Sequence, residues 1–415
     1  MCGSSMQLYD LYRGKDYHIV PTLERIERAV DYLSLKTSYL SLQVGGTNGK
    51  GSTCAFLQNI LRHHGYKVGW FVSPHLFEER ERWRVNGEKI SEERLSQLVK
   101  ELKGIFERFE LTYFEACTLI ALKYFEEERV DFAVFEVGMG GRWDATKVCQ
   151  PEVCIVTNIQ RDHTRWLGRD CESRAVEKLG IYREGKPLVL GSMRYPLYPK
   201  ALELCRQEDL LVAGIDFFAS GRVEGLKTYM DFYRDDLLEL QDMELGLWGR
   251  YQVENASLAI KGAGLLIKLE EERLREGLKN TRWEGRMELV REKPLLLLDG
   301  AHNPDGVARV VKEVKRHIGS LTPVFTALKD KEWELSLPYL RELSDRIYLL
   351  PVRHHRGEEI KRVYEKAREY HFKEVHLLKD VAEIFRLEED LIVLGSLYLV
   401  GELKEWLERG EKHEG

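Results

Sequence analysis

Residues 41–53 read Ser41-Leu42-Gln43-Val44-Gly45-Gly46-Thr47-Asn48-Gly49-Lys50-Gly51-Ser52-Thr53, an apolar run followed by a glycine-rich turn. The run predicts a buried strand at Ser41–Val44, and the apolar periodicity beyond the turn predicts a helix at Ser52–His64. Such a turn presents backbone N–H groups and a positive helix dipole to an anion. Lys50 would reach the terminal phosphates of a nucleotide, and a hydroxyl of Ser52 or Thr53 would reach Mg²⁺.

A plain strand-to-helix turn is the alternative, and it is disfavoured by three glycines together with a Gly-Lys pair at this junction. We therefore expect phosphate binding in a nucleotide site. The expected contacts are Thr47, Asn48, Gly49, Lys50, Gly51 and Ser52.

Apolar runs alternate with amphipathic segments along the chain, which is typical of an α/β fold with mostly parallel sheets. We expect an N-terminal P-loop ATPase domain over residues 1–283 and a C-terminal Rossmann-like domain over residues 287–415. The C-terminal strands are expected at Leu295–Leu298, Pro323–Ala327, Ile347–Pro351, Val375–Leu378 and Leu391–Leu394. A less regular stretch, residues 220–247, predicts a hairpin-rich segment.

The composition limits the function classes. The chain has 415 residues, with 63 Lys and Arg against 69 Asp and Glu and a net charge of -6. This balance gives no basic field for nucleic acid or an anionic membrane, and no apolar run is long enough to span a bilayer. The seven cysteines form no Cys-x-x-Cys motif, so we expect a reducing, cytoplasmic location.

The glycine-rich turn departs from the general P-loop pattern at two positions. Val44 stands where that pattern has its first glycine, and Gly51 stands where it has Ser or Thr after the lysine. An ordinary kinase, GTPase or other P-loop phosphotransferase is therefore disfavoured. The variant GTNGKGS resembles the phosphate loop of folylpolyglutamate synthases and dihydrofolate synthases, which are relatives of the muramyl peptide ligases.

The resemblance recurs in order along the chain. The matching segments are Ser73-Pro74-His75-Leu76 with Glu81-Arg82 and Arg84-Val85-Asn86-Gly87, Thr112-Tyr113-Phe114-Glu115, Glu136-Val137-Gly138-Met139-Gly140-Gly141-Arg142-Trp143-Asp144-Ala145-Thr146, Thr157-Asn158-Ile159 with Asp162-His163-Thr164, Glu177-Lys178-Leu179-Gly180-Ile181, Asp299-Gly300-Ala301-His302-Asn303-Pro304, Asp330-Lys331 and Gly395-Ser396-Leu397-Tyr398.

The resemblance implies an ATP-dependent ligase that adds L-glutamate to dihydropteroate, to reduced folates and folylpolyglutamates, or to both. Catalysis would pass through an acyl phosphate and release ADP and phosphate. It also implies two Mg²⁺ ions, ATP as a substrate and compatibility with K⁺. We expect small-molecule partners only, with no nucleic acid and no membrane, and a monomer. The alternative is a muramyl-type amino acid ligase acting on another carboxylate, disfavoured because no separate nucleotide-sugar domain precedes Gly45.

Candidate metal ligands follow predicted strands or lie in matched segments. Glu136 ends a buried strand before a glycine-rich turn, a position suited to a Mg²⁺ ligand, and an exposed acid is the alternative. His163 follows another strand, and a structural histidine is its alternative. The resemblance also implies Ser73, Ser52 and a carbamylated Lys178 near the metal. An ordinary solvated lysine is the alternative for Lys178.

The substrate contacts rest mainly on the resemblance. It places Asp144 and Ala145 at the pteroate pocket and Arg82 beside that pocket. The alternative for Asp144 is a helix cap, and the alternative for Arg82 is solvated surface. It places Asn255 at the adenine, Asp299 at the ribose and Arg286 at an interdomain hinge. Capping is again the alternative for Asn255 and Asp299. His302 and Ser396 would lie near the incoming glutamate. The expected catalytic set is Lys50, Asp144, Lys178 and His302.

Two residues depart from the family pattern near these segments. Tyr251 stands where relatives carry His, and Lys147 stands where they carry Asn after Asp-Ala-Thr. Both departures would alter nucleotide or pterin contacts, and neither falls on a predicted metal or phosphate ligand.

Overall fold

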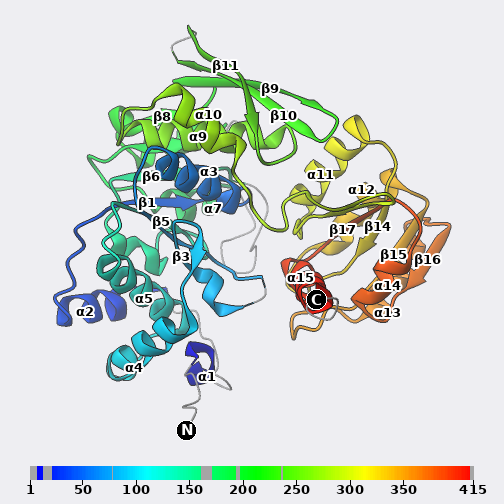
Figure 1. Ribbon diagram of the computed structural model, residues 1–415, viewed down its shortest axis with the longest axis horizontal. Helices are drawn as coiled ribbons and strands as arrows, with labels where there is room; N and C mark the ends of the chain where they lie inside the picture. Colours follow the sequence, from blue (N-terminus) through cyan, green and yellow to red (C-terminus); the bar gives the residue numbers. More distant parts are fainter. Residues whose placement is uncertain are drawn as a thin grey trace.

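The computed structural model describes residues 7–12, 21–76, 78–159, 171–192, 197–234 and 237–411. These residues form two lobes (Figure 1). The first lobe runs from blue to green and carries an eight-stranded sheet and a three-stranded sheet, and the second runs from yellow to red and carries a six-stranded sheet. Both larger sheets are mostly parallel, which confirms the predicted α/β fold class.

The eight-stranded sheet places the strand of the glycine-rich turn near its centre, in the order β4-β3-β2-β5-β1-β6-β7-β8. Its strands are β1 (Leu40–Gly45), β2 (Val68–Phe71), β3 (Trp83–Val85), β4 (Glu88–Lys89), β5 (Phe132–Glu136), β6 (Val153–Val156), β7 (Leu188–Leu190) and β8 (Leu210–Val212). The antiparallel edge pair β3–β4 was not predicted. Because β1 pairs in parallel with β5 and β6, the carboxyl ends of these three strands meet at one edge.

Helices cover this sheet and connect its strands. They are α1 (Leu8–Tyr12), α2 (Glu24–Tyr32), α3 (Lys50–His63), α4 (Glu92–Arg108), α5 (Tyr113–Glu127), α7 (Cys171–Leu179), α8 (Leu197–Leu204), α9 (Tyr251–Gly264) and α10 (Glu271–Lys279), with 3₁₀ turns η1 (Glu79–Arg82), η2 (Ala145–Cys149) and η3 (Gln207–Asp209). Helix α5 begins at Tyr113, because Thr112 and Glu115 form a capping box there.

Helix α3 is buried from Gly51 to Leu61, not only along the apolar stripe that its sequence predicts. One core cluster joins Phe56 and Ile60 of α3 with residues of α9 and α10, so neighbouring helices cover the polar side as well. A helix enclosed in this way is held firmly at its N-terminus, where the glycine-rich turn lies.

The segment expected to be rich in hairpins forms the three-stranded antiparallel sheet, in the order β11-β10-β9. Its strands are β9 (Phe217–Glu224), β10 (Lys227–Arg234) and β11 (Leu237–Leu245). Met230, Phe232 and Met243 join the core cluster that contains α3 and α9. This sheet therefore belongs to the first lobe.

The second lobe has the strand order β12-β13-β17-β14-β15-β16. Its strands are β12 (Glu288–Glu292), β13 (Leu295–Leu298), β14 (Thr322–Phe325), β15 (Arg346–Leu349), β16 (Glu374–Leu377) and β17 (Leu391–Leu394), and its helices are α11 (Pro304–His317), α12 (Leu337–Leu343) after the 3₁₀ turn η4 (Trp333–Ser336), α13 (Ile360–Glu369), α14 (Val381–Arg386) and α15 (Leu397–Glu411). The antiparallel edge strand β12 was not predicted, because none of its residues is buried and its sequence lacks a continuous apolar run.

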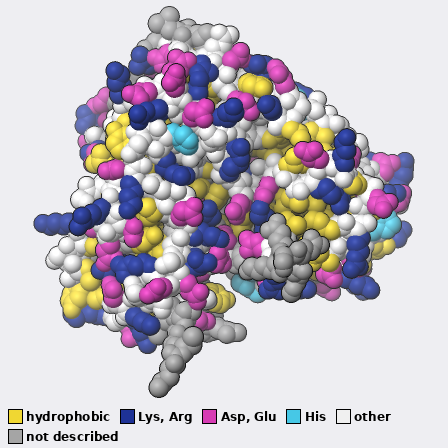
Figure 2. All heavy atoms as spheres, viewed as in Figure 1, with side chains coloured by type: hydrophobic (Ala, Val, Ile, Leu, Met, Phe, Trp, Pro, Cys, Tyr) yellow, Lys and Arg dark blue, Asp and Glu magenta, His cyan; other side chains and the backbone are white. Residues whose placement is uncertain are grey.

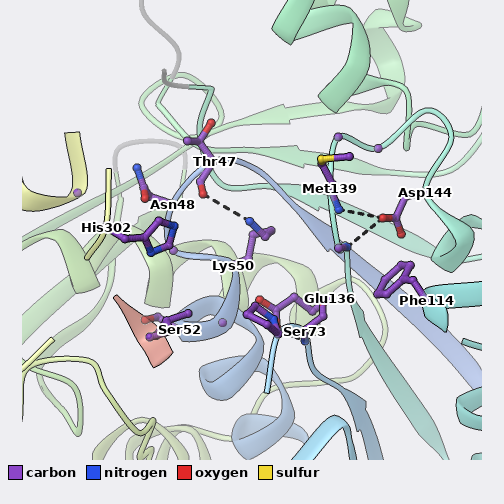
Figure 3. A pocket seen from close by; sticks show the side chains of 18 of the residues that line it. Thr47, Asn48, Lys50, Ser52, Ser73, Phe114, Glu136, Met139, Asp144 and His302 are labelled. Atoms are coloured by element: carbon purple, nitrogen blue, oxygen red, sulfur yellow. Dashed lines mark hydrogen bonds between the residues drawn. The ribbon is translucent and has the colours of Figure 1, made fainter. Parts of the chain in front are cut away.

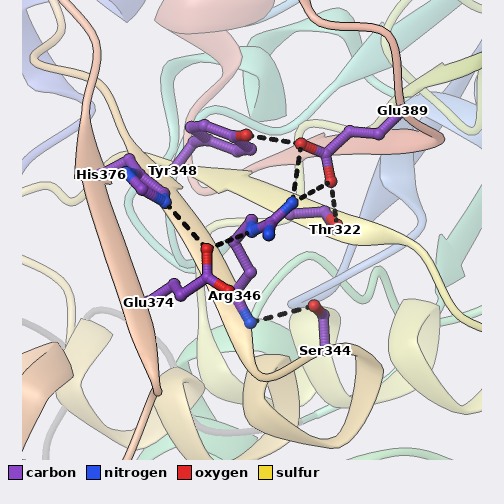
Figure 4. Close-up of polar contacts among 7 residues, drawn as sticks. All are labelled: Thr322, Ser344, Arg346, Tyr348, Glu374, His376 and Glu389. Atoms are coloured by element: carbon purple, nitrogen blue, oxygen red, sulfur yellow. Dashed lines mark hydrogen bonds and ion pairs between the residues drawn. The ribbon is translucent and has the colours of Figure 1, made fainter.

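A polar cluster joins three strands of this sheet at their amino ends (Figure 4). The guanidinium of Arg346 lies between the carboxylates of Glu374, at 2.8 Å, and Glu389, at 3.4 Å. The hydroxyl of Thr322 also donates to Glu389, at 2.8 Å. The cluster lies at the sheet edge opposite the carboxyl ends of the strands, so it stabilises the lobe and leaves the other edge for ligands.

The molecular surface carries interspersed acidic and basic side chains on the face that Figure 2 shows. No helix in the described part of the chain is long and apolar enough to cross a bilayer.

Candidate active site

A cavity of about 710 Å³ is lined by residues of both lobes. Most of the residues singled out from the sequence lie on its wall: Thr47, Asn48, Gly49, Lys50, Gly51, Ser52, Ser73, Arg82, Glu136, Asp144, Ala145, Asn255, Arg286, Asp299 and His302. Lys178 and Ser396 are not among the lining residues, although their neighbours Glu177 and Leu397 are. His163 lies outside the described residues.

The glycine-rich turn joins β1 to α3, as predicted, and its glycines have conformations that other residues rarely adopt. Gly46 and Gly49 have φ angles of 130° and 85°. A Cβ on Gly49 would lie 2.4 Å from Oδ1 of Asn255, so this position has no room for a side chain. Lys50 Nζ donates to the carbonyl oxygens of Gly46, at 3.0 Å, and Thr47, at 3.4 Å. The ammonium is thus folded over its own turn (Figure 3).

Glu136 and Ser73 lie on two neighbouring strand ends beside Lys50. The Ser73 backbone N–H donates to Glu136 at 3.2 Å, and the carboxylate is 5 % exposed, which rules out an exposed acid. Burial raises the pKa of Glu136 to about 7, against the lowering effect of Lys50. The buried Ser73 hydroxyl has no hydrogen-bond partner in the described part of the chain. A desolvated carboxylate and an unsatisfied hydroxyl fit a divalent cation.

Asp144 has the capping role that was weighed as its alternative. It caps the 3₁₀ turn η2 by accepting from the Thr146 N–H at 3.0 Å, and its second oxygen accepts from the N–H groups of Gly138 and Met139 at 2.9 and 3.0 Å. Burial raises its pKa, against these hydrogen bonds. The carboxylate therefore fixes the loop of the cavity wall, and Figure 3 shows it on the side of Lys50 away from His302.

Lys178 is 2 % exposed, so the alternative of a solvated lysine is wrong. It lies near the end of α7, which is held by the same loop that contains Asp144. The Arg142 N–H donates to the Glu177 carbonyl at 2.9 Å, and Lys147 Nζ donates to the Gly180 carbonyl at 2.6 Å. Lys147, one of the two residues that depart from the family pattern, thus stabilises the end of α7, and its side chain does not line the cavity.

Arg82 is 8 % exposed, so it is not solvated surface. Its Nε donates to Nδ1 of His75 at 2.9 Å, and its guanidinium lies over the Tyr113 ring, 5.2 Å from the centroid. Burial and the charge of Arg82 lower the pKa of His75 to about 3, so the ring is neutral and accepts this hydrogen bond.

Asn255 and Asp299 do not cap helices. Asn255 lies one turn inside α9 and donates to Oε1 of Gln252 at 2.9 Å. Asp299 is 2 % exposed and accepts from the N–H groups of Ala301 and Met287 at 2.8 and 3.0 Å, whereas Asn303 caps the following helix. Tyr251, the second departure, lines the cavity, and its buried hydroxyl has no partner among the described residues.

Of the two residues expected near the incoming glutamate, His302 lines the cavity and Ser396 does not. His302 lines the cavity, and its Nδ1 lies 2.8 Å from the Gly300 carbonyl. Because a carbonyl only accepts, Nδ1 carries the proton in the neutral ring. Ser396 is 1 % exposed, and its hydroxyl accepts from the Tyr398 N–H at 3.0 Å. It therefore shapes the turn that brings Tyr398 to the cavity.

Several lining residues were not selected as site residues from the sequence. They are Arg25, Phe114, Trp283, Arg309, Lys331, Arg356 and Tyr398. Lys331 and Tyr398 lie in segments that match the family, and this position in the sequence could have identified them as site residues. Trp283 precedes Arg286 at the junction of the lobes, and no periodicity or spacing indicates its contact with the glycine-rich turn.

Comparison with known proteins agrees with this architecture. Residues 44–183 match the Mur ligase middle domain, and residues 285–400 match the Mur ligase glutamate ligase domain. A dihydrofolate synthase/folylpolyglutamate synthase of Bacillus subtilis is 32% identical over 398 residues, covering 88% of this chain and 90% of that protein. The chain belongs to the folylpolyglutamate synthase/dihydrofolate synthase family.

Solved structures of this family superpose along almost the whole chain. Escherichia coli FolC in complex with DHPP and ADP has a TM-score of 0.87 at 29% identity and covers 97% of both chains. The Yersinia pestis bifunctional folylpolyglutamate synthase/dihydrofolate synthase, complexed with AMPPNP and a Mn ion, has a TM-score of 0.86 at 30% identity, with 97% and 98% covered. The family recognised from short motifs is thus confirmed over both lobes.

Proposed function

We propose that the protein is an ATP-dependent ligase that adds L-glutamate to dihydropteroate, to reduced folates including folylpolyglutamates, or to both, releasing ADP and phosphate. The observation that carries this proposal is the shared cavity. The phosphate loop and Glu136 of the first lobe face the same space as His302 and Asp299 of the second. A chain of this family therefore has one space in which nucleotide, carboxylate and amine can meet.

The phosphate loop would hold the nucleotide. Backbone N–H groups at the start of α3 and the Lys50 ammonium would contact the phosphates, with Asn255 at the base and Asp299 at the ribose. Arg286 lines the same space, so its guanidinium could reach the phosphates. These groups lie on both lobes, so nucleotide binding would favour closure and exclude water.

A divalent cation fits the first lobe, because Glu136 is a buried carboxylate and the neighbouring Ser73 hydroxyl has no hydrogen-bond partner among the described residues. Ser52, Ser73 and Glu136 would hold it, together with His163 and a carbamylated Lys178. Mg²⁺ supplies charge neutralisation at the phosphates. A second Mg²⁺ and a K⁺ ion are further parts of the proposal.

The reaction needs an activated carboxylate. The γ-phosphoryl group moves from ATP to an oxygen of the pteroate or folate carboxylate, and ADP leaves. The glutamate nitrogen then attacks the carbonyl carbon, the amide bond forms, and phosphate leaves with the electron pair of the broken C–O bond. Asp144 would orient the acceptor through the loop that it fixes, and Nε2 of His302 would face the glutamate amine and accept its proton.

The decisive experiment measures ADP release from ATP and Mg²⁺ with glutamate, offering dihydropteroate and tetrahydrofolate separately and identifying products by mass. Release that requires both glutamate and one acceptor supports the proposal. ADP formation without either acceptor contradicts it, and a product on another carboxylate alone would indicate a muramyl-type ligase.

We also propose that the protein is a monomer, because the two lobes of one chain complete the cavity. We propose in addition that it is cytoplasmic.

A further inference from the structure

Two side-chain amides join the lobes at the rim of the phosphate loop. Nδ2 of Asn303 donates to Oδ1 of Asn48 at 3.1 Å, and Nδ2 of Asn48 lies 3.4 Å from Oδ1 of Asn303. Each amide thus offers its donor to the acceptor of the other. Asn303 is 2 % exposed and Asn48 is half-buried on the cavity wall, so water has little access to the Asn303 end of the pair.

The Asn48 end is fixed to the first lobe. Its backbone N–H donates to Oδ1 of Asn158 at 2.9 Å, and its carbonyl accepts from Nδ2 of Asn158 at 2.8 Å and from the Thr157 hydroxyl at 2.6 Å. These partners directly follow β6. A shift of Asn48 would therefore break contacts with the edge of the central sheet.

The Asn303 end is fixed to the second lobe. Its Oδ1 caps α11 by accepting from the Gly306 N–H at 2.8 Å, and a Cβ on Gly306 would lie 3.1 Å from this same oxygen, which leaves little room for a side chain there. His302 directly precedes the cap and lines the cavity. The amide pair therefore ties the phosphate loop to the segment that presents His302.

We propose that Asn303 is a positioning residue that acts through Asn48. The pair holds the phosphate loop in register with the amino-acid side of the cavity, so that the phosphorylated carboxylate and the attacking amine are aligned. This inference rests on the proposed ligase function. It assigns to Asn303 a role in the rate of transfer beyond its role as a helix cap.

The test separates alignment from capping. Asn303→Ser keeps a good cap but is too short to reach Asn48. Loss of one net hydrogen bond at the reacting geometry should lower kcat about tenfold. Nucleotide analogue affinity should stay within about twofold, because the loop's own contacts remain. Asp380→Ser, which changes the exposed cap of α14 in the same lobe, is the matched control and should keep the wild-type kcat.

Asn48→Ala and the double variant complete a cycle. If the amides act through one another, the double variant loses no more than the more damaging single change. Two results would overturn the inference: a double variant whose fold loss in kcat equals the product of the two single losses, or an unchanged kcat in Asn303→Ser. Small-angle scattering with bound nucleotide analogue gives a second readout: Asn303→Ser should scatter as a more open particle, and an identical radius of gyration counts against the pair. This readout survives even if the wild type ligates no pteroate or folate, an outcome that would refute the proposed function.

Discussion

The indole Nε1 of Trp283 lies 2.6 Å from the position that a Cβ on Gly51 would occupy. Gly51 is one of the two residues at which the phosphate loop departs from the general P-loop pattern. Trp283 also packs against Trp70, with ring centroids 4.6 Å apart, and the Arg84 guanidinium lies 5.6 Å from its ring. The junction between the lobes thus rests on the first turn of α3, which explains the missing side chain at residue 51.

Gly51→Ala should weaken nucleotide binding and reduce the free energy of unfolding by about 1–3 kcal/mol, because the new methyl group overpacks the Trp283 contact. Calorimetric nucleotide titration and denaturant unfolding measure both effects. Gly104→Ala is the control, since that helical glycine has nothing within 4 Å of its Cβ position, and it should be neutral or stabilising. Wild-type stability and affinity in Gly51→Ala would contradict the packing argument.

Lys50→Ala should abolish most ligation while leaving the fold intact. Its ammonium donates to two carbonyl oxygens of its own loop, and its role at the phosphates would be electrostatic, so we expect a fall in kcat of about 10²–10³-fold. Steady-state ADP release measures the loss. Lys100→Ala, an exposed lysine of α4, should be unaffected. Near-normal turnover in Lys50→Ala would refute the phosphate-loop assignment.

His302→Ala should impair the use of glutamate more than the binding of ATP. The side chain lies on the second lobe and faces the cavity across from Lys50 (Figure 3). The glutamate KM should rise or kcat should fall, whereas the dissociation constant of a nucleotide analogue should hardly change. An unchanged glutamate dependence would show that this imidazole has no part in the second half-reaction.

Lys178→Ala should be nearly inactive and partly rescued by formate or acetate, which can occupy the vacated space as an oxygen ligand. Carbamylation needs the neutral amine, and Lys178 is 2 % exposed beside the cavity wall. Lys178→Met keeps most of the packing volume and should be equally inactive without unfolding. Isotopically labelled bicarbonate should label the wild type and not these variants. Full activity in either variant, or an unmodified ammonium beside bound substrates, would rule out the carbamate.

Stability should fall as the pH drops from about 6.5 toward 4, in part because of His354. Its Nδ1 accepts from the Arg356 N–H at 3.2 Å, and its ring stacks on Tyr398 at 3.7 Å. Burial and neighbouring cationic groups lower its pKa to about 4. The native state therefore binds fewer protons than the unfolded chain in this window, and acid favours unfolding. His354→Asn, which keeps an acceptor, should reduce the acid sensitivity in denaturant titrations; an identical pH profile would contradict this contribution.

Features that depend only on neighbouring residues could be predicted from the sequence. Glycines at 46 and 49 fix the turn, and apolar runs such as Leu295–Leu298 fix buried strands, because backbone conformation and periodicity are local properties. Motif order was enough to recognise the family. Strand β12 was missed because a half-exposed edge strand lacks that apolar signal.

Which of these residues contact one another depends on the tertiary structure. Asn48 and Asn303 are 255 positions apart, and no spacing rule relates them. The burial of Lys178, the exclusion of Ser396 from the cavity wall and the packing of Trp283 on Gly51 likewise depend on how helices, loops and lobes pack. Local sequence sets the conformation of each segment, but contacts between distant segments follow from the global arrangement that buries the most apolar surface while pairing buried polar groups.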